Sequence, residues 1–105
     1  MHTTKLTDGQ LLSQYKAGNE EAFAVLLERH KDRVFTTIYV IVKDRYQAED
    51  LMQDVFIKVI NVIKKGKYNE EGKFLPWILR IAHNLAIDYF RKSKRFPENI
   101  ISSLI

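Results

Sequence analysis

Hydrophobic residues recur along this chain at intervals of three and four, which is the spacing of an amphipathic α-helix. Three such runs occupy residues 23–41, 51–63 and 78–89. Their expected inward positions are Phe23, Leu26, Leu27, His30, Val34, Ile38 and Ile41, then Leu51, Met52, Val55, Phe56, Val59, Val62 and Ile63, and finally Ile78, Ala82, Leu85 and Tyr89. The pattern predicts helices that each bury one face in a shared core.

Polar residues that favour helix starts precede these runs. Thr7 and Gln10 have the spacing of a capping box, which predicts a short first helix with residues 11, 12 and 15 facing inward. Gly18 suits a left-handed stop for that helix. Asn19 then predicts the start of a second helix, which runs to about residue 42.

Similar signals bound the rest of the chain. Asp44 predicts the start of a third helix that ends near residue 65, and a polar loop over residues 66–73 contains one aromatic residue, Tyr68. Pro76 fits the first turn of a fourth helix, and Pro97 is expected to end it. The prediction is an all-α fold, a compact four-helix domain over residues 1–96.

The composition agrees with this fold and excludes several classes of chemistry. The chain has 105 residues with only four Gly and two Pro, which suits one domain of long regular elements. Without Cys, it has no disulfides, thiolate metal ligands or cysteine nucleophiles. The longest apolar run, residues 34–42, is too short to cross a bilayer, and the N-terminus does not resemble a signal peptide. We expect a soluble, cytoplasmic protein.

Charge is distributed unevenly. The chain carries a net charge of +4, but residues 64–95 hold nine Lys and Arg against three Asp and Glu, a net of +6. The remainder holds eight basic and ten acidic residues, a net of −2. The basic segment is expected to attract a polyanion such as nucleic acid, although a merely solvated basic face has the same composition.

One outward face of the third helix is acidic and polar around a single aliphatic residue. This face consists of Asp50, Gln53, Asp54, Ile57 and Asn61. Charged residues around an apolar centre resemble a protein-binding surface. On spacing alone, a solvated helix face with one stray Ile57 explains the pattern as well.

The fourth helix has an outward stripe of different chemistry, made of Trp77, Arg80, Asn84, Asp88 and Arg91. An aromatic ring, cations and an amide are the groups that bind single-stranded bases, by stacking, phosphate contact and hydrogen bonding. Trp77 alone is equally consistent with a core residue. The whole stripe beside Tyr68 favours nucleic acid.

Catalytic and metal sites are not indicated, so we expect a binding protein and not an enzyme. Asp50 and Asp54 are one helical turn apart, but no His has the spacing of a di-iron site. His30 and His83 are isolated in the sequence, and there is no phosphate-binding Gly loop or activated Ser. No metal or other cofactor is expected.

Two longer motifs resemble a known family. Residues 47–59, QAEDLMQDVFIKV, resemble the AED-hydrophobic-x-Q-[DE]-x-F-hydrophobic-K motif of extracytoplasmic-function (ECF) sigma factors. Residues 74–84, FLPWILRIAHN, resemble their F-x-x-W-L-x-R-I-A-x-N motif, and DYFRK at 88–92 resembles its ending. Residues 8–23 are similar to the first helix pair of the family. The resemblance covers nearly all of residues 6–95 and implies the fold of sigma factor region 2.

The resemblance also implies partners and residue roles. It implies that the outward face of the third helix binds the β′ clamp helices of core RNA polymerase, and that the loop and fourth helix hold the non-template strand of the promoter −10 element. In the family, Tyr68 falls on a usually aromatic loop position, Asn84 on a base-pocket position, and Trp77 and Arg80 on melting and backbone-contacting positions. The residues expected to bind polymerase are Asp50, Gln53, Asp54, Ile57, Lys58 and Asn61. The residues expected to bind DNA are Tyr68, Lys73, Trp77, Arg80, His83, Asn84, Asp88, Arg91, Lys92 and Arg95.

Sigma factors of this type have a second helical domain (region 4), which reads the −35 element. We expect residues 97–105 to begin the linker to that domain, which is absent from this chain, and an anti-sigma factor is an expected further partner. One alternative is a helical interaction module, such as an anti-sigma or adaptor protein, but it would not need the basic, aromatic segment 68–92. A second is a nucleic-acid enzyme or accessory domain with a carboxylate site, but a third ligand group is missing.

Overall fold

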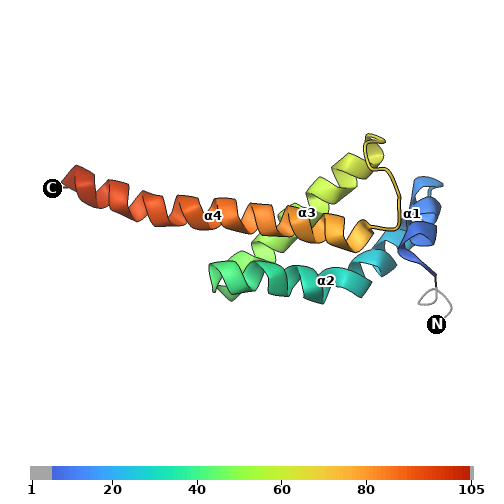
Figure 1. Ribbon diagram of the computed structural model, residues 1–105, viewed down its shortest axis with the longest axis horizontal. Helices are drawn as coiled ribbons and strands as arrows, with labels where there is room; N and C mark the ends of the chain where they lie inside the picture. Colours follow the sequence, from blue (N-terminus) through green and yellow to red (C-terminus); the bar gives the residue numbers. More distant parts are fainter. Residues whose placement is uncertain (1–5, 105) are drawn as a thin grey trace.

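The computed structural model describes the backbone of residues 6–104 and the side chains of residues 6–93. The described residues form four helices, α1 (Asp8–Lys16), α2 (Glu20–Val42), α3 (Arg45–Lys64) and α4 (Phe74–Leu104), in an all-α fold (Figure 1). The predicted fold class, the number of helices and the starts of the first three are therefore confirmed. No helix in the described part of the chain is long and apolar enough to cross a membrane.

Side-chain caps fix the first three helix starts. The Thr7 hydroxyl accepts a hydrogen bond from the Gln10 amide at 3.1 Å, and the Thr7 amide donates to Gln10 Oε1 at 2.8 Å, which completes the capping box. Asn19 caps α2 and Asp44 caps α3 through similar bonds to backbone amides. Gly18 has a φ of 110°, so it ends α1 in the left-handed region as predicted. Each such cap stabilises a helix by about 1 kcal/mol.

Helix α2 lies at the centre of the packing. It contacts α1, α3 and α4, and α3 also contacts α4. The buried apolar residues come from all four helices and from the loop before α4. They are Leu11, Leu12, Ala22, Phe23, Leu26, Val34, Ile38, Ala48, Leu51, Val55, Val59, Ile63, Tyr68, Phe74, Ile78, Ala82 and Ala86. Full burial of a Leu, Ile or Val side chain contributes about 1.5–3 kcal/mol, so this cluster dominates the stability of the domain.

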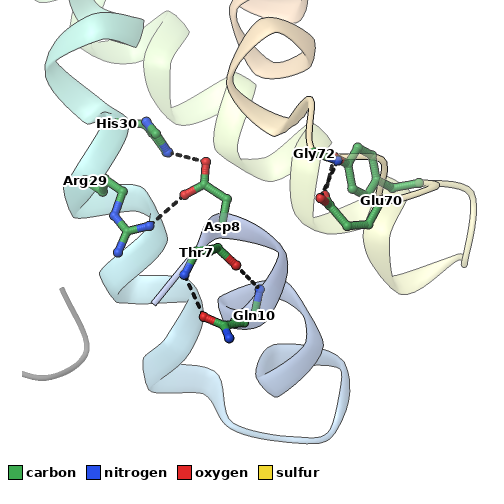
Figure 2. Close-up of polar contacts among 8 residues, drawn as sticks. Thr7, Asp8, Gln10, Arg29, His30, Glu70 and Gly72 are labelled. Carbon is green, nitrogen blue, oxygen red and sulfur yellow. Dashed lines mark hydrogen bonds and ion pairs between the residues drawn. The ribbon is translucent and has the colours of Figure 1, made fainter. Parts of the chain in front are cut away.

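A polar contact fastens α1 to α2 (Figure 2). Asp8 accepts from the Arg29 guanidinium at 2.8 Å through Oδ1, and its Oδ2 lies 2.8 Å from Nε2 of His30. His30 is only 8% exposed, and its ring centroid lies 5.9 Å from that of Phe74, the first residue of α4. His30 is therefore a core residue that joins three helices.

The prediction that Pro97 ends the fourth helix is wrong. Helix α4 continues through this position to Leu104 and extends beyond the other three helices (Figure 1). A proline removes one amide donor and crowds one carbonyl, which disfavours a helix locally. Here α4 is already established over several turns, and adding residues to an existing helix is far easier than starting one. The predicted start of an interdomain linker at residue 97 stays a prediction.

Candidate nucleic-acid and protein interfaces

The outward face of α3 brings together the residues predicted to bind polymerase. Asp50, Gln53, Asp54, Ile57, Lys58 and Asn61 are all exposed. Ile57 is 55% exposed, whereas Val55 and Val59 on the opposite side of the helix are fully buried. We refer to these six exposed residues as the α3 face. It presents an aliphatic side chain surrounded by polar and charged groups.

A groove runs along one edge of the α3 face. It has a volume of about 410 Å³ and is lined by Asp54, Ile57, Lys58, Asn61, Val62, Lys65 and Lys67. Its lining passes from the acidic middle of α3 to basic residues at the end of the helix. A partner lying in this groove would contact Ile57 and groups of both charges.

Sequence reasoning missed an aromatic residue in line with the α3 face. Tyr46 lies one helical turn before Asp50 and is 79% exposed, the largest exposure among the large hydrophobic residues of the described chain. Residues four apart on a helix share one side, so Tyr46 extends the α3 face toward the start of the helix. The four-residue spacing between Tyr46 and Asp50 is the sequence signal that could have identified Tyr46 as part of this surface.

The predicted DNA-binding residues of α4 are largely on the surface. His83, Asn84, Asp88, Arg91 and Lys92 are exposed, as are Arg80 and the loop residue Lys73. Trp77 is partly buried and packs against the core while keeping part of its surface open. The side chain of Arg95 lies outside the described residues.

A hollow lies where the loop meets the first turns of α4. It has a volume of about 250 Å³ and is lined by Lys67, Tyr68, Asn69, Glu71, Lys73, Pro76, Trp77 and Arg80. Aromatic rings form part of its wall, and three cations surround them. Asn84 is not among its lining residues, so the structure does not bring Asn84 and Tyr68 together in this hollow.

Tyr68 points inward and does not project from the loop. It is 9% exposed, and its ring centroid lies 4.3 Å from that of Trp77 and 6.1 Å from that of Phe74, edge-on to the latter. Its hydroxyl donates to Glu70 Oε1 at 2.8 Å. Burial, the hydrogen bond to Glu70 and the charges of Glu70, Asp8 and Glu71 raise the pKa of Tyr68 above its usual value. Tyr68 thus packs against Trp77 and offers little free ring surface.

Among the described residues, no three His, Asp or Glu side chains lie close enough together to hold a metal ion. His30 is engaged with Asp8 inside the domain, and His83 stands exposed on α4.

Comparisons with known proteins define the class of this domain. The family model described as Sigma-70 region 2 matches residues 26–96, more than half of the chain, and the chain belongs to this family. This chain is 36% identical over 84 residues to the ECF RNA polymerase sigma factor SigW of Bacillus subtilis (strain 168). The match covers 79% of this chain and 43% of SigW. The chain is 34% identical over 86 residues to the ECF RNA polymerase sigma factor SigX of the same organism, covering 80% of this chain and 42% of SigX.

A third relative comes from another organism. The RNA polymerase sigma factor CarQ of Myxococcus xanthus is 34% identical over 83 residues, covering 79% of this chain and 47% of CarQ. The resemblance to ECF sigma factors is thereby confirmed. The chain spans less than half the length of these three relatives.

Proposed function

We propose that this domain is the region 2 part of an ECF-type sigma factor, binding core RNA polymerase through the α3 face and the opened promoter −10 element through the loop and α4. The observation that carries the proposal is that one domain of the sigma-70 region 2 family exposes two surfaces of different chemistry. The domain contributes binding and no catalysis, and it needs no cofactor. It acts in the cytoplasm, where polymerase and promoter DNA are found.

The α3 face supports the polymerase half of the proposal. Its partner is proposed to be the pair of β′ clamp helices, with Ile57 as the buried centre of contact and Asp50 and Asp54 as the charges that orient docking. Apolar groups at the centre of an interface supply most of the affinity, while charges at its rim mainly guide association. The distribution of Ile57 and its acidic neighbours fits that arrangement.

The hollow and the α4 surface support the DNA half of the proposal. Opening a duplex costs a few kcal/mol for each unstacked base. Stacking a freed base on an aromatic side chain returns about 1–3 kcal/mol. Trp77 offers a ring at the wall of the hollow, while Lys73 and Arg80 stand beside it to contact phosphates. Opening is thus favoured by capture of the unpaired strand.

The test is a comparison of DNA forms across a salt series by fluorescence anisotropy. Attraction to the basic segment weakens steeply with salt for any DNA, because binding releases counterions. Base capture requires unpaired bases and depends less on salt. We expect the domain to prefer single-stranded non-template −10 DNA over the matching duplex, with a preference that grows as salt rises.

Two substitutions separate these contributions. Trp77→Ala should reduce the preference for the single strand, whereas Lys92→Ala should lower both affinities together. Equal affinity for single strand and duplex at every salt concentration would contradict the strand-opening role. An interaction module without DNA binding would then be the better description of the domain.

A further inference from the structure

Glu70 is not among the residues predicted to bind polymerase or DNA, but its carboxylate makes two hydrogen bonds within the loop before α4. Its Oε1 accepts from the Tyr68 hydroxyl at 2.8 Å. Its Oε2 accepts from the Gly72 amide at 2.6 Å (Figure 2). The side chain therefore joins the beginning and the end of the turn that leads into α4. Gly72 has a φ of 75°, so this turn uses a backbone conformation that favours glycine.

Glu70 also packs against α1. A Cβ atom added to Gly9 would lie 3.1 Å from Oε2 of Glu70, which is tighter than most Cβ contacts, and 3.4 Å from its Cδ, which is an ordinary contact distance. Gly9 stands in the first turn of α1 and has no left-handed φ, so its backbone conformation does not require glycine. Alanine would be the better helix former at this position. The close approach of Glu70 therefore favours a residue without a side chain at this position.

The position of the carboxylate is favourable for charge as well as for space. The first turn of a helix carries the positive end of its dipole, which attracts a carboxylate. The hydrogen bonds from Tyr68 and Gly72 fix the carboxylate within the loop, and this attraction draws it toward α1.

We propose that the Glu70 cluster (Gly9, Tyr68, Glu70 and Gly72) is a positioning device that holds Tyr68 against Trp77 and so shapes the hollow that receives an unpaired base. This inference rests on the proposed function. Tyr68 is buried, and a tyrosine hydroxyl carries its proton at neutral pH. Its hydroxyl therefore needs an acceptor inside the domain, and Glu70 provides it.

Loss of Glu70 leaves the Tyr68 hydroxyl buried without that acceptor, so the ring is expected to turn toward water. Trp77, whose centroid lies 4.3 Å from that of Tyr68, then loses its support. A binding site held in its bound shape before the ligand arrives binds more tightly than one that must be ordered. Glu70 thus acts through Tyr68 and Trp77 and does not need to touch DNA itself.

The test uses Glu70→Ala and Gly9→Ala in the full chain, with two measurements. Trp77 is the only tryptophan, so its fluorescence emission without DNA reports on the hollow directly. The second measurement is the ratio of single-strand to duplex affinity for −10 DNA. Both variants are expected to shift the emission, and Glu70→Ala is expected to lower the ratio about fivefold, the value of a typical hydrogen bond.

Gly9→Ala distinguishes positioning from a loss of folding. The added methyl group suits the helical backbone of α1 but pushes the carboxylate of Glu70 by a few tenths of an ångström. We therefore expect the ratio to fall while the melting temperature stays close to that of the unchanged protein. In a Glu70→Ala background the same substitution should have no further effect on emission or ratio, because its target is gone. Glu70→Gln, which keeps one acceptor oxygen, should recover part of the ratio.

Glu28→Gln is the control for charge, since Glu28 is exposed on α2 and pairs only with Lys31 among the salt bridges of the described residues. It should leave emission and ratio unchanged. Wild-type emission and ratio in both Glu70→Ala and Gly9→Ala would overturn the inference. If the unchanged protein shows no preference for the single strand, the proposed function is wrong. The positioning role of the Glu70 cluster is then judged from fluorescence alone, and unshifted emission in Glu70→Ala would reject it.

Discussion

Nε2 of His30 lies 2.8 Å from Oδ2 of Asp8, and this contact ties the first turn of α1 to the middle of α2. The other oxygen of Asp8 accepts from Arg29 at 2.8 Å. One carboxylate therefore fastens a short, nine-residue helix that buries only Leu11 and Leu12 from within its own length. The position of α1 depends on this polar contact as well as on its small apolar surface.

Replacing Asp8 should consequently weaken the domain more than replacing a similar carboxylate elsewhere. We expect Asp8→Asn to lower the free energy of unfolding by about 1–2 kcal/mol, because charge-assisted bonds to Arg29 and His30 are lost. Glu20→Gln is the matched control, since Glu20 also stands in a helix first turn but is exposed. Urea denaturation followed by circular dichroism gives both values, and equal losses would show that Asp8 acts only on the helix dipole.

Substitutions on the α3 face should affect polymerase binding without affecting the fold. Asp54→Lys reverses a charge and is expected to weaken binding to the β′ clamp helices at least about tenfold, and Gln53→Ala should weaken it less. Both residues are exposed, so helicity and melting temperature should change little. Isothermal titration calorimetry with the isolated clamp helices measures the affinity. Glu28→Lys, a charge reversal on α2, serves as the control, and unchanged binding by the α3 variants would exclude this face.

Asn84 is predicted to read a base. Its side chain is exposed on α4, and a side-chain amide can make paired hydrogen bonds to a base edge. Asn84→Ala should reduce discrimination among −10 sequences by about 1–3 kcal/mol for the base concerned. Affinity for unrelated single strands should remain the same. An equal loss for every sequence tested would make Asn84 a backbone-contacting residue.

The raised pKa of Tyr68 predicts a specific dependence of stability on pH. Below the ordinary tyrosine pKa of about 10, the hydroxyl is protonated in both folded and unfolded chains, and its bond to Glu70 should make the unchanged protein about 1 kcal/mol more stable than Tyr68→Phe. Above that pH the unfolded chain loses the proton while the folded domain keeps it, so unfolding becomes easier. The difference between the two proteins should therefore shrink as pH rises past 10. Because the other tyrosines are present in both proteins, their ionisation does not change this difference in stability. A difference that stays constant from pH 8 to about 11 would mean that the hydroxyl ionises equally in both states.

The helices were predictable because their signals are local. Thr7, Asn19 and Asp44 cap the helices that follow them, as their side chains and spacing indicate. Pro97 is also a local signal, but its cost of about 3 kcal/mol does not end α4, which continues to Leu104. A local breaker is therefore a weaker guide than a local cap.

The inner side of the loop was not predictable in the same way. Whether Tyr68 faces outward depends on Phe74, Trp77 and Glu70, whose arrangement exists only once the domain has folded. The contact between Glu70 and Gly9 joins residues far apart in the sequence. Its only sequence signal is a glycine inside a predicted helix, where alanine would suit the backbone better.

The central place of α2 has a consequence for the order in which the domain opens. Because α2 contacts each of the other three helices, exposing its buried amides to water requires several packed surfaces to separate together. Amides in the middle of α2, near Val34 and Ile38, should exchange their hydrogens with deuterium only through global unfolding. Among the described residues, the larger helix contacts of α1 are with α2 only. The amides of α1 should therefore exchange earlier, through a local detachment that leaves the remaining helices assembled.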